Sequence, residues 1–364
     1  MLHILNALHQ FAFKFNYLLP LYRLYLKLNR ACYFIGDDTK PKAILVSFSP
    51  WKREFVKKFI PEYNIGFIYK RFNTEPVFNW LSEQDIPLII WGYQERDFMR
   101  PHLNKFDTIY RMEDGFLRSK QLGAMHTPPY SLVLDSQDLY YNAGAPSDLE
   151  DILNQKKFTH DQIQQAAQCI EKLKQSGVSK YNVATPQSLD DILGEKAKQR
   201  VLVVGQVEED ASIKMGCVKQ ITNNDLVRLA HKENPEADII YKIHPDVIAK
   251  KRKKISNTGD VSGICTILEQ DVRPADLFKG VDKVYTITSL MGFEALIYGL
   301  KVTCYGLPFY AGWGLTDDRQ PCSRRTAKLS LEEVFAGAYL LYPRYYDTIA
   351  DKPVIITEII DALS

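Results

Sequence analysis

The segment 282–319 constrains the fold of this chain more than any other part of the sequence. It opens with Asp282–Thr288, an apolar run that predicts a buried strand ending in small hydroxyl residues. Ser289–Gly299 then predicts a short helix, and Lys301–Gly306 predicts a second strand. A strand, a helix and a strand in succession define an α/β unit, and its helix N-terminus at Ser289 suits an anion because of its unpaired N–H groups and dipole. An ordinary packing unit with a capping serine would show the same pattern.

Two further features of this segment favour a functional reading. Glu294 lies about one and a half turns into the predicted helix, where its carboxylate can accept hydrogen bonds from a ribose. The loop Leu307–Arg319 concentrates aromatic residues, two glycines and a proline. Such a composition is costly in backbone entropy unless a defined loop is needed, so it indicates a loop with a function.

Length and composition bound the class of protein. The 364 residues suffice for two domains of ordinary size, and 46% hydrophobic with 25% charged residues is typical of a globular protein. A net charge of +2 argues against a general nucleic-acid binder, so no nucleic-acid partner is expected. The six cysteines are scattered without a CxxC pair, which predicts reduced thiols in a cytoplasmic protein and no zinc site.

The first 40 residues differ from the rest of the chain. From Leu2 to Ile35 there is no acidic residue, and basic residues interrupt an apolar, aromatic sequence. The pattern matches neither a signal peptide nor a membrane-spanning helix, because the basic residues lie inside the apolar stretch. It predicts an amphipathic helix on an anionic membrane surface. The alternative is a helix that packs on the protein body or on another subunit.

From residue 41 onward, predicted strands alternate with predicted helices, which indicates parallel sheets with helices on both faces. The hydrophilic stretch 176–199 separates two such halves. The sequence therefore predicts a basic segment over 1–40, a Rossmann-like domain over 41–190 and a second one over 191–364. The predicted elements also include a strand-like piece at Leu139–Asn142, a basic helix or loop at Lys250–Lys254 and a closing helix at Leu329–Leu341.

Polar clusters follow four of the predicted strands. They are Glu113 and Asp114, the run Gln206–Asp210, the pair His244 and Asp246, and Thr288 and Ser289 with Glu294. Each has a plain structural explanation as a turn, a solvated loop or a cap. In parallel sheets, however, ligands bind at the carboxyl ends of the strands, so the four clusters together predict an active site. Neither GxGxxG nor a P-loop is present, which argues against dinucleotide redox enzymes and P-loop ATPases.

Several of these runs resemble the bacterial capsule polysaccharide β-Kdo transferases of the KpsC/LipB type. The resemblance lies in Glu113–Ser119, Gly205–Ile213, Lys242–Asp246 and the block Thr288–Arg319, in the family's order and spacing. Many members carry two such modules in tandem, and this chain has one. The resemblance implies a GT-B-like fold with two Rossmann-like domains facing a cleft. It also implies a retaining enzyme that moves Kdo (3-deoxy-D-manno-oct-2-ulosonic acid) from CMP-β-Kdo to a glycolipid or polysaccharide acceptor.

The resemblance also implies residue roles. Asp210 corresponds to the nucleophile of a double displacement, Glu113 to an acid/base on the acceptor hydroxyl, and His244 to a group near the departing phosphate or sugar carboxylate. Donor contacts would come from Gln206, Lys242, Ser289 and Glu294, and sugar or acceptor contacts from Asp114 and Arg118. These roles are chemically consistent, since a carboxylate is the usual nucleophile in a retaining reaction and helix N–H groups with a cation can stabilise a departing phosphate without a metal. No cofactor or metal is expected.

The implied partners are CMP-Kdo, the acceptor, the inner-membrane surface and other assembly proteins of capsule or lipopolysaccharide synthesis. The implied location is cytoplasmic, peripheral on the inner face of the membrane. Two alternatives stay open at this stage. One is a non-catalytic GT-B-like module of an assembly complex, and the other is a transferase for a different CMP-activated ulosonic acid such as a sialic acid.

Overall fold

The computed structural model of the chain describes Pro20 and residues 32–35, 37–68, 75–120, 126–180, 182, 187–249 and 251–364. The chain divides into two compact units, which are described separately. Unit 1 contains Met1–Glu113 and Leu134–Gln137, and unit 2 contains Asp114–Val133 and Asp138–Ser364.

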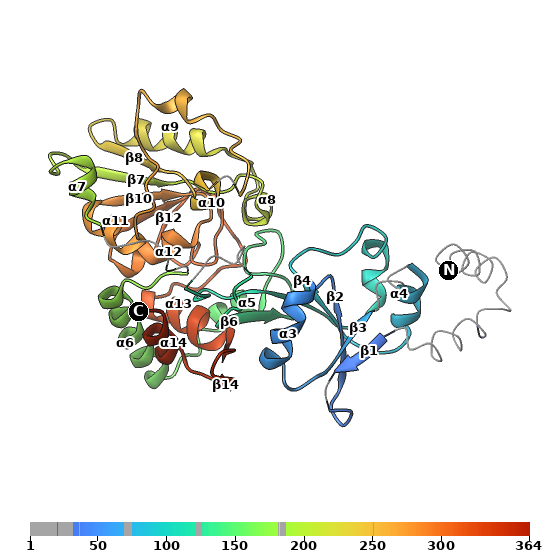
Figure 1. Ribbon diagram of the computed structural model, residues 1–364. Helices are drawn as coiled ribbons and strands as arrows, with labels where there is room; N and C mark the ends of the chain where they lie inside the picture. Colours follow the sequence, from blue (N-terminus) through green and yellow to red (C-terminus); the bar gives the residue numbers. More distant parts are fainter. Residues whose placement is uncertain are drawn as a thin grey trace. The chain divides into compact units, whose positions relative to one another are not determined.

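Unit 1 is built on a parallel sheet (Figure 1). Its strands are β2 (Lys42–Val46), β3 (Asn64–Ile68), β4 (Leu88–Trp91) and β5 (Ile109–Asp114), joined by α3 (Pro50–Phe59), α4 (Glu75–Leu81) and the 3₁₀ helix η3 (Arg100–Lys105). The strand order is β3-β2-β4-β5, and β1 (Cys32–Ile35) pairs antiparallel with β3 at the edge. The strands are buried apolar runs, because helices and connections cover both faces of such a sheet.

Unit 2 contains a six-stranded sheet that is parallel throughout. Its strands are β7 (Arg200–Val204), β8 (Asp238–Lys242), β9 (Thr266–Leu268), β10 (Lys283–Thr286), β11 (Lys301–Cys304) and β12 (Asp317–Asp318). The strand order is β12-β11-β10-β7-β8-β9, so the chain runs outward from β7 in one direction and then starts again from β10 in the other. This is the doubly wound arrangement, and the prediction of an α/β fold with parallel sheets is confirmed.

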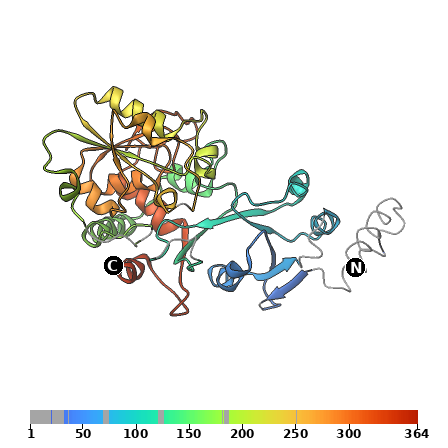
Figure 2. The same ribbon diagram turned by 45° about the horizontal axis from the view of Figure 1, so that its top comes forward.

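Helices cover both faces of this sheet (Figures 1 and 2). They are α8 (Ala211–Gly216), α9 (Asn223–Glu233), α10 (Pro245–Ile248), α11 (Pro274–Gly280), α12 (Leu290–Ile297) and the 3₁₀ turn η5 (Thr258–Val261). α9 begins at a Thr222 capping box and buries Leu226, Val227 and Ala230 against the apolar core that β7 and β8 share. The helix positions follow from the sequence, since an apolar face and a capping threonine together define where a helix starts and which side it buries.

The remaining elements of unit 2 are a set of helices and a group of antiparallel strands, of which β6 is shared with unit 1. The helices are α5 (Asp148–Gln155), α6 (His160–Ser176), α7 (Leu189–Leu193), α13 (Leu331–Phe335), the π-helical turn η6 (Ala336–Leu341) and α14 (Ile356–Leu363). β6 (Ser131–Asp135) pairs antiparallel with β13 (Pro343–Asp347), which in turn pairs with β14 (Lys352–Pro353). The apolar face of α6 packs against α13, η6 and α14.

The compact units differ from the domain boundaries expected from sequence. The hydrophilic stretch before residue 191 predicted a boundary there, whereas α5 and α6 belong to the same unit as the six-stranded sheet. The reason is packing, because the apolar faces of these helices are covered by elements that come some 160 residues later, after residue 330. A polar linker marks a break in hydrophobic pattern, and in this chain it does not mark a break in the core.

Several local predictions also need correction. Leu139–Asn142 is a turn and not a strand, with Asn142 N–H bonded to the Leu139 carbonyl at 2.8 Å. The predicted closing helix is α13 followed by the π-helical η6, and it does not close the fold, since β13, β14 and α14 follow it. The described part of Lys250–Lys254, residues 251–254, is a loop.

The predicted N-terminal amphipathic helix falls within residues 1–40, of which positions 1–19, 21–31 and 36 lie outside the described residues. Across the described parts of the chain, no helix is long and apolar enough to span a bilayer.

Candidate functional site

The candidate site lies where the two halves of the six-stranded sheet diverge. The connections after β7 and β10 leave neighbouring strands in opposite directions, and in sheets of this kind ligands bind at the carboxyl edge where the strand order reverses. Gln206 follows β7, and its side chain spans the divergence. Its Nε2 donates to Thr288 Oγ1 at 3.1 Å, and its Oε1 accepts the Thr288 backbone N–H at 2.8 Å. The structure therefore brings together one residue from each of two of the predicted clusters.

The loop after β7 is held rigidly from the other side as well. Asn223 makes a paired contact with the Gln206 backbone, accepting its N–H at 3.0 Å and donating to its carbonyl at 2.9 Å. Glu208 accepts hydrogen bonds from the Asn223 backbone N–H at 2.7 Å and from the Ser256 backbone N–H at 2.9 Å. Gln206 and Glu208 therefore hold the loop after β7 in place through these hydrogen bonds. Asp210 lies at the end of this loop.

Asp210 is the N-cap of α8 and is exposed. Its Oδ1 accepts hydrogen bonds from the Ser212 backbone N–H at 2.9 Å and from the Ser212 hydroxyl at 2.7 Å. The cap fixes the orientation of the carboxylate, since one oxygen is bound to the helix start. A carboxylate held in this way is oriented for a reaction without having to be ordered first.

His244 follows β8 and is the N-cap of α10. Its Nδ1 accepts the Asp246 backbone N–H at 3.1 Å, so the neutral ring carries its proton on Nε2. Burial lowers the pKa of His244, the charges of Asp246 and Asp210 act in the opposite direction, and the charges of Lys242 and Arg252 lower it further. A neutral imidazole with an Nε2–H can donate a hydrogen bond to an anionic oxygen.

Lys242 ends β8 and is 3% exposed. Burial lowers the pKa of its ammonium group, and the nearby charge of Asp271 opposes that effect. The hydrogen bond from its Nζ to the Gln270 carbonyl is long, at 3.5 Å. A buried cation with so weak an acceptor is unfavourable unless an anion approaches it.

Ser289 is the N-cap of α12, as the sequence predicts, with its Oγ accepting the Met291 N–H at 3.2 Å. The Ser289 carbonyl accepts a hydrogen bond from the Tyr310 hydroxyl at 2.5 Å. Gly292 makes room for this contact, because a Cβ there would lie 2.1 Å from the Tyr310 hydroxyl. Tyr310, in the loop that follows β11, thereby holds the start of α12 in place.

Glu294 lies deeper than the sequence suggests. It is 9% exposed, and its Oε1 accepts hydrogen bonds from the Ser179 hydroxyl at 2.6 Å and the Lys180 backbone N–H at 3.3 Å. Burial raises the pKa of Glu294, and these two hydrogen bonds oppose the increase. In the structure the carboxyl group therefore joins α12 to the segment after α6.

The acidic cluster at the end of β5 is divided between the two units. Glu113 is the last residue of the first part of unit 1, and Asp114 belongs to unit 2. Asp114 Oδ2 accepts a hydrogen bond from Arg118 Nε at 2.7 Å. Arg118 is 2% exposed and also donates to Ser119 Oγ at 2.9 Å and the Thr127 carbonyl at 3.0 Å. The two residues expected to contact sugar or acceptor thus bind each other.

The aromatic loop after β11 is a structural brace. Phe309, Tyr310 and Trp313 are all at most 4% exposed, and the Trp313 indole N–H donates to the Phe309 carbonyl at 2.8 Å. Gly312 and Gly314 have φ of +86° and +90°, which explains why glycine is needed at both positions. The unusual composition of this loop therefore arises from packing.

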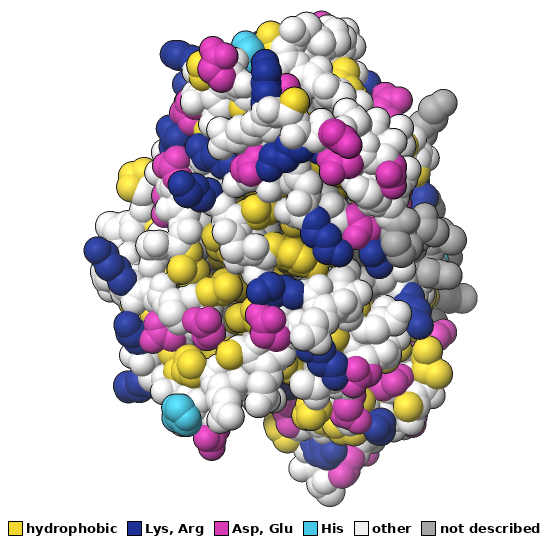
Figure 3. All heavy atoms as spheres, turned by 90° about the vertical axis from the view of Figure 1, so that its left-hand side faces the viewer, with side chains coloured by type: hydrophobic (Ala, Val, Ile, Leu, Met, Phe, Trp, Pro, Cys, Tyr) yellow, Lys and Arg dark blue, Asp and Glu magenta, His cyan; other side chains and the backbone are white. Residues whose placement is uncertain are grey.

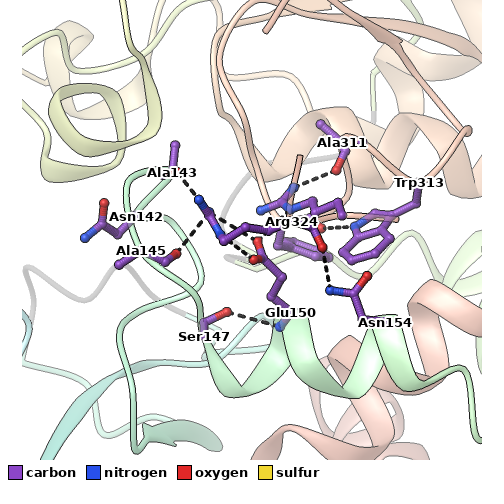
Figure 4. A network of polar contacts seen from close by, with 12 residues as sticks. Asn142, Ala143, Ala145, Ser147, Glu150, Asn154, Ala311, Trp313 and Arg324 are labelled. Carbon is purple, nitrogen blue, oxygen red and sulfur yellow. Dashed lines mark hydrogen bonds and ion pairs between the residues drawn. The ribbon is translucent and has the colours of Figure 1, made fainter. Parts of the chain in front are cut away.

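A charged network that the sequence did not single out supports this loop (Figure 4). Glu150 of α5 is 4% exposed and pairs with Arg324 Nε at 2.7 Å and Arg325 Nε at 3.0 Å. Arg325 NH1 donates to the Pro308 and Ala311 carbonyls, both at 2.6 Å. The paired arginines are visible in the sequence, but their partner lies about 174 residues away, and no local pattern links the two.

Arg324 extends this network toward α8. Its NH2 donates to the carbonyls of Ala143 and Ala145 at 2.9 and 3.1 Å. The Ala143 N–H donates in turn to the Met215 carbonyl near the end of α8 at 3.0 Å. The network thus holds the turn after Leu139 against the helix that Asp210 caps.

Within the part of the chain that the structure describes, no group of three or more His, Cys, Asp or Glu side chains is arranged to hold a metal ion. The six cysteines are free thiols in the structure, and Cys169, Cys217 and Cys304 are buried.

A doubly wound sheet with polar side chains gathered at its divergence defines an α/β protein of the Rossmann-like class. The chain matches the model of one family, described as capsule polysaccharide biosynthesis protein, over residues 88–348. The match covers well over half of the chain, so the chain belongs to the family of capsule polysaccharide biosynthesis proteins.

Similar proteins agree with this assignment. The chain is 45% identical to the lipopolysaccharide-processing protein LpsZ of Rhizobium meliloti over 85% of its own length and 71% of that protein. It is 38% identical to the capsule polysaccharide modification protein LipA of Neisseria meningitidis over 85% of its length, but it spans only 44% of that protein.

Two solved structures from Thermosulfurimonas dismutans share the fold. They are the KpsC β-Kdo 2,4 transferase, with 31% identity and a TM-score of 0.74, and the KpsC β-Kdo 2,7 transferase, with 36% identity and a TM-score of 0.71. Each match covers 88% of this chain and 97% or 98% of the solved chain. The resemblance to the KpsC/LipB type is confirmed, and the chain is a glycosyltransferase.

Proposed function

We propose that this chain is a retaining β-Kdo transferase that moves Kdo from CMP-β-Kdo to a glycolipid or polysaccharide acceptor in capsule or lipopolysaccharide biosynthesis. The solved relatives, which are named as β-Kdo transferases, support the sugar. The family description and the named relatives support the pathway. The observation that carries the proposed mechanism is the exposed, oriented carboxylate of Asp210 close to the neutral His244.

In this proposal Asp210 attacks the anomeric carbon of the donor. One new bond forms between a carboxylate oxygen and that carbon, and the bond from the carbon to the CMP phosphate oxygen breaks with its electron pair. A second displacement by the acceptor hydroxyl then breaks the glycosyl-aspartate ester, so that two inversions give retention. The hydrogen bonds from Ser212 support this role, since they orient the carboxylate and leave it exposed.

The departing CMP is an anion, and three groups at the carboxyl edge suit it. His244 can donate from Nε2, Lys242 carries a positive charge with only a weak acceptor, and α12 begins at Ser289, directly after β10. Gln206 joins the loop that ends in Asp210 to Thr288 through two hydrogen bonds. In this proposal no metal or other cofactor takes part, and His244, Lys242 and the N-terminus of α12 stabilise the negative charge of the departing CMP.

Three further assignments complete the proposal. Glu113 is the acid/base on the acceptor hydroxyl, within a GT-B-like arrangement of two Rossmann-like domains. Glu294 binds the ribose, and its contact with Ser179 then fixes the carboxyl group for that contact. Asp114 and Arg118 contribute to the sugar or acceptor side as a bound pair.

The proposed location is the inner face of the cytoplasmic membrane, where a lipid-linked acceptor and the other assembly proteins are found. The basic, aromatic composition of residues 1–40 supports a peripheral attachment.

Intact-protein mass spectrometry tests the donor and the covalent route together. The wild type and Asp210→Asn are incubated with freshly generated CMP-Kdo without acceptor. Asparagine also caps helices well, so the variant should keep the start of α8. A mass gain of one Kdo unit on the wild type alone is expected.

Three other outcomes would revise the proposal. A mass gain on both proteins would reject Asp210 as the nucleophile. Donor consumption without a covalent adduct on the wild type would argue for front-face attack. A gain with a CMP-activated sialic acid, and none with CMP-Kdo, would keep the mechanism and change the sugar.

A further inference from the structure

A run of basic residues follows α10 and has no role in the proposed reaction. The sequence reads Lys250-Lys251-Arg252-Lys253-Lys254-Ile255, five consecutive basic residues and then an isoleucine. Residues 251–254 are all exposed, and Ile255 is 52% exposed. Residues 251–255 form a surface segment termed the basic loop.

The basic loop is fixed at both ends beside the candidate site. At its start, the Lys251 and Arg252 N–H groups donate to the Asp246 carbonyl at 2.9 and 3.1 Å. At its end, Ser256 donates to Glu208 from its backbone N–H at 2.9 Å and from its hydroxyl at 2.5 Å. The loop is therefore held at the carboxyl edge of the six-stranded sheet, and the charge of Arg252 is near enough to lower the pKa of His244.

The charges of Arg252, Lys253 and Lys254 face no neighbouring carboxylate within ion-pair distance in the described part of the chain. Lys254 Nζ instead donates to Thr258 Oγ1 at 2.8 Å. The face in Figure 3 shows the usual alternative, with Lys and Arg side chains interspersed among Asp and Glu. A concentrated charge of one sign attracts an anionic partner over a range of about 8 Å in physiological salt.

We propose that the basic loop binds an anionic membrane surface and turns the carboxyl edge of the sheet toward it. Exposed Ile255 beside the lysines favours a membrane over a soluble polyanion, because an apolar side chain gains by entering the boundary between headgroups and acyl chains. Each basic residue near an anionic bilayer strengthens binding about fivefold. The binding does not depend on the proposed reaction, although it would bring the site to a lipid-linked acceptor.

Vesicle sedimentation of the full chain tests this proposal. The loop variant carries Lys251→Gln, Arg252→Gln, Lys253→Gln and Lys254→Gln. The matched control removes the same charge from four scattered, exposed positions of unit 2, with Lys157→Gln, Lys198→Gln, Lys232→Gln and Lys301→Gln. Both variants keep residues 1–40, so any difference between them reports on the basic loop.

With vesicles that contain phosphatidylglycerol, the loop variant is expected to bind at least about tenfold more weakly than wild type, and the control within about threefold. High salt should reduce wild-type binding, because exposed charges are screened. The difference in affinity between the wild type and the loop variant should therefore become smaller. Ile255→Ser should weaken binding by about threefold, and by the same factor in high salt. Thermal unfolding of each variant shows that the fold is intact.

Three results would overturn the proposal. One is binding of the loop variant equal to that of the control, and another is no wild-type binding to anionic vesicles. The third is retention of vesicle binding by the loop variant with loss of binding to alginate, a soluble anionic polysaccharide, which would assign the loop to an anionic chain. The Kdo adduct without acceptor should still form in the loop variant, because neither Asp210 nor His244 is replaced, so this test fails or succeeds independently of the proposed reaction.

Discussion

Two loops at the carboxyl edge of the same sheet have opposite characters. The loop after β7, Gln206–Asp210, is composed of ordinary polar residues and ends in an exposed carboxylate. The loop after β11, Leu307–Arg319, has the more conspicuous sequence, yet its three aromatic side chains are buried. The difference teaches that an unusual composition marks a demanding backbone path, whereas reactive groups are found where polar side chains stay exposed and oriented.

The largest effect is expected when the carboxylate of Asp210 is removed and the N-cap of α8 is kept. Asp210→Asn is expected to lower the rate of sugar transfer at least about a thousandfold, because the nucleophile is lost. The free energy of unfolding should change by less than about 0.5 kcal/mol, since asparagine also caps helices. Transfer is measured by the CMP released with acceptor present, and stability by urea unfolding.

Glu209→Gln is the matched control for this experiment, because Glu209 is the exposed acidic residue directly before Asp210. Its transfer rate should stay within about threefold of wild type, as expected for an exposed side chain without a role. A large loss in Glu209→Gln, or near-normal transfer in Asp210→Asn, would move the reactive group elsewhere.

A change in the buried network around Glu150 should give the converse result, a loss of stability with little loss of transfer activity. Glu150→Gln removes the charge that faces Arg324 and Arg325, and Arg325 is 8% exposed as a residue. Breaking a buried ion pair on one side costs about 3–5 kcal/mol, so a loss near the lower end is expected in urea unfolding. Below its lowered unfolding temperature, the variant should retain most of its transfer activity. Unchanged stability would mean that the brace contributes nothing.

The smallest effect is expected for Glu294, which is buried like Glu150 but is also a proposed donor contact. Because burial raises its pKa above the usual value, its protonated form is favoured in the folded state. Its contribution to stability is therefore full below its unfolded pKa of about 4.3 and is lost as pH rises through the folded pKa.

Glu294→Gln should not show that loss, since Ser179 can still donate to the amide oxygen. The stability of the variant relative to wild type should therefore rise from acid to neutral pH in urea unfolding. If the difference in stability between variant and wild type does not change with pH, burial does not raise the pKa of Glu294. The same variant should weaken CMP binding if Glu294 contacts the ribose, and calorimetry can measure this.

Much of the fold could be predicted, because the information is local. Apolar runs of four or five residues predict the strands, and Thr159 and Thr222 with their capping partners predict the starts of α6 and α9. The gathering of Gln206 with Thr288 was predictable too, since parallel strands bring their carboxyl ends to one edge. These inferences depend on periodicity and topology, which a single sequence carries.

Other features could not be predicted, because they depend on contacts between distant segments. Nothing local shows that Glu150 meets Arg324, or that Glu294 is covered by Ser179. Leu139–Asn142 has strand-like composition but is required as a turn against α8. The grouping of α5 and α6 with unit 2 also depends on contacts with distant segments.

The packing of α6 has a consequence for how the chain is made. The apolar side of this helix is synthesised by residue 176, but its covering helices α13 and α14 arrive only after residue 330. On the ribosome, the parallel strands of unit 1 can assemble early, whereas α6 must wait for almost the whole remaining chain. During that interval an exposed apolar helix needs protection, so this region of the chain is where we expect a chaperone to act and where truncation from the C-terminal side should lead to aggregation.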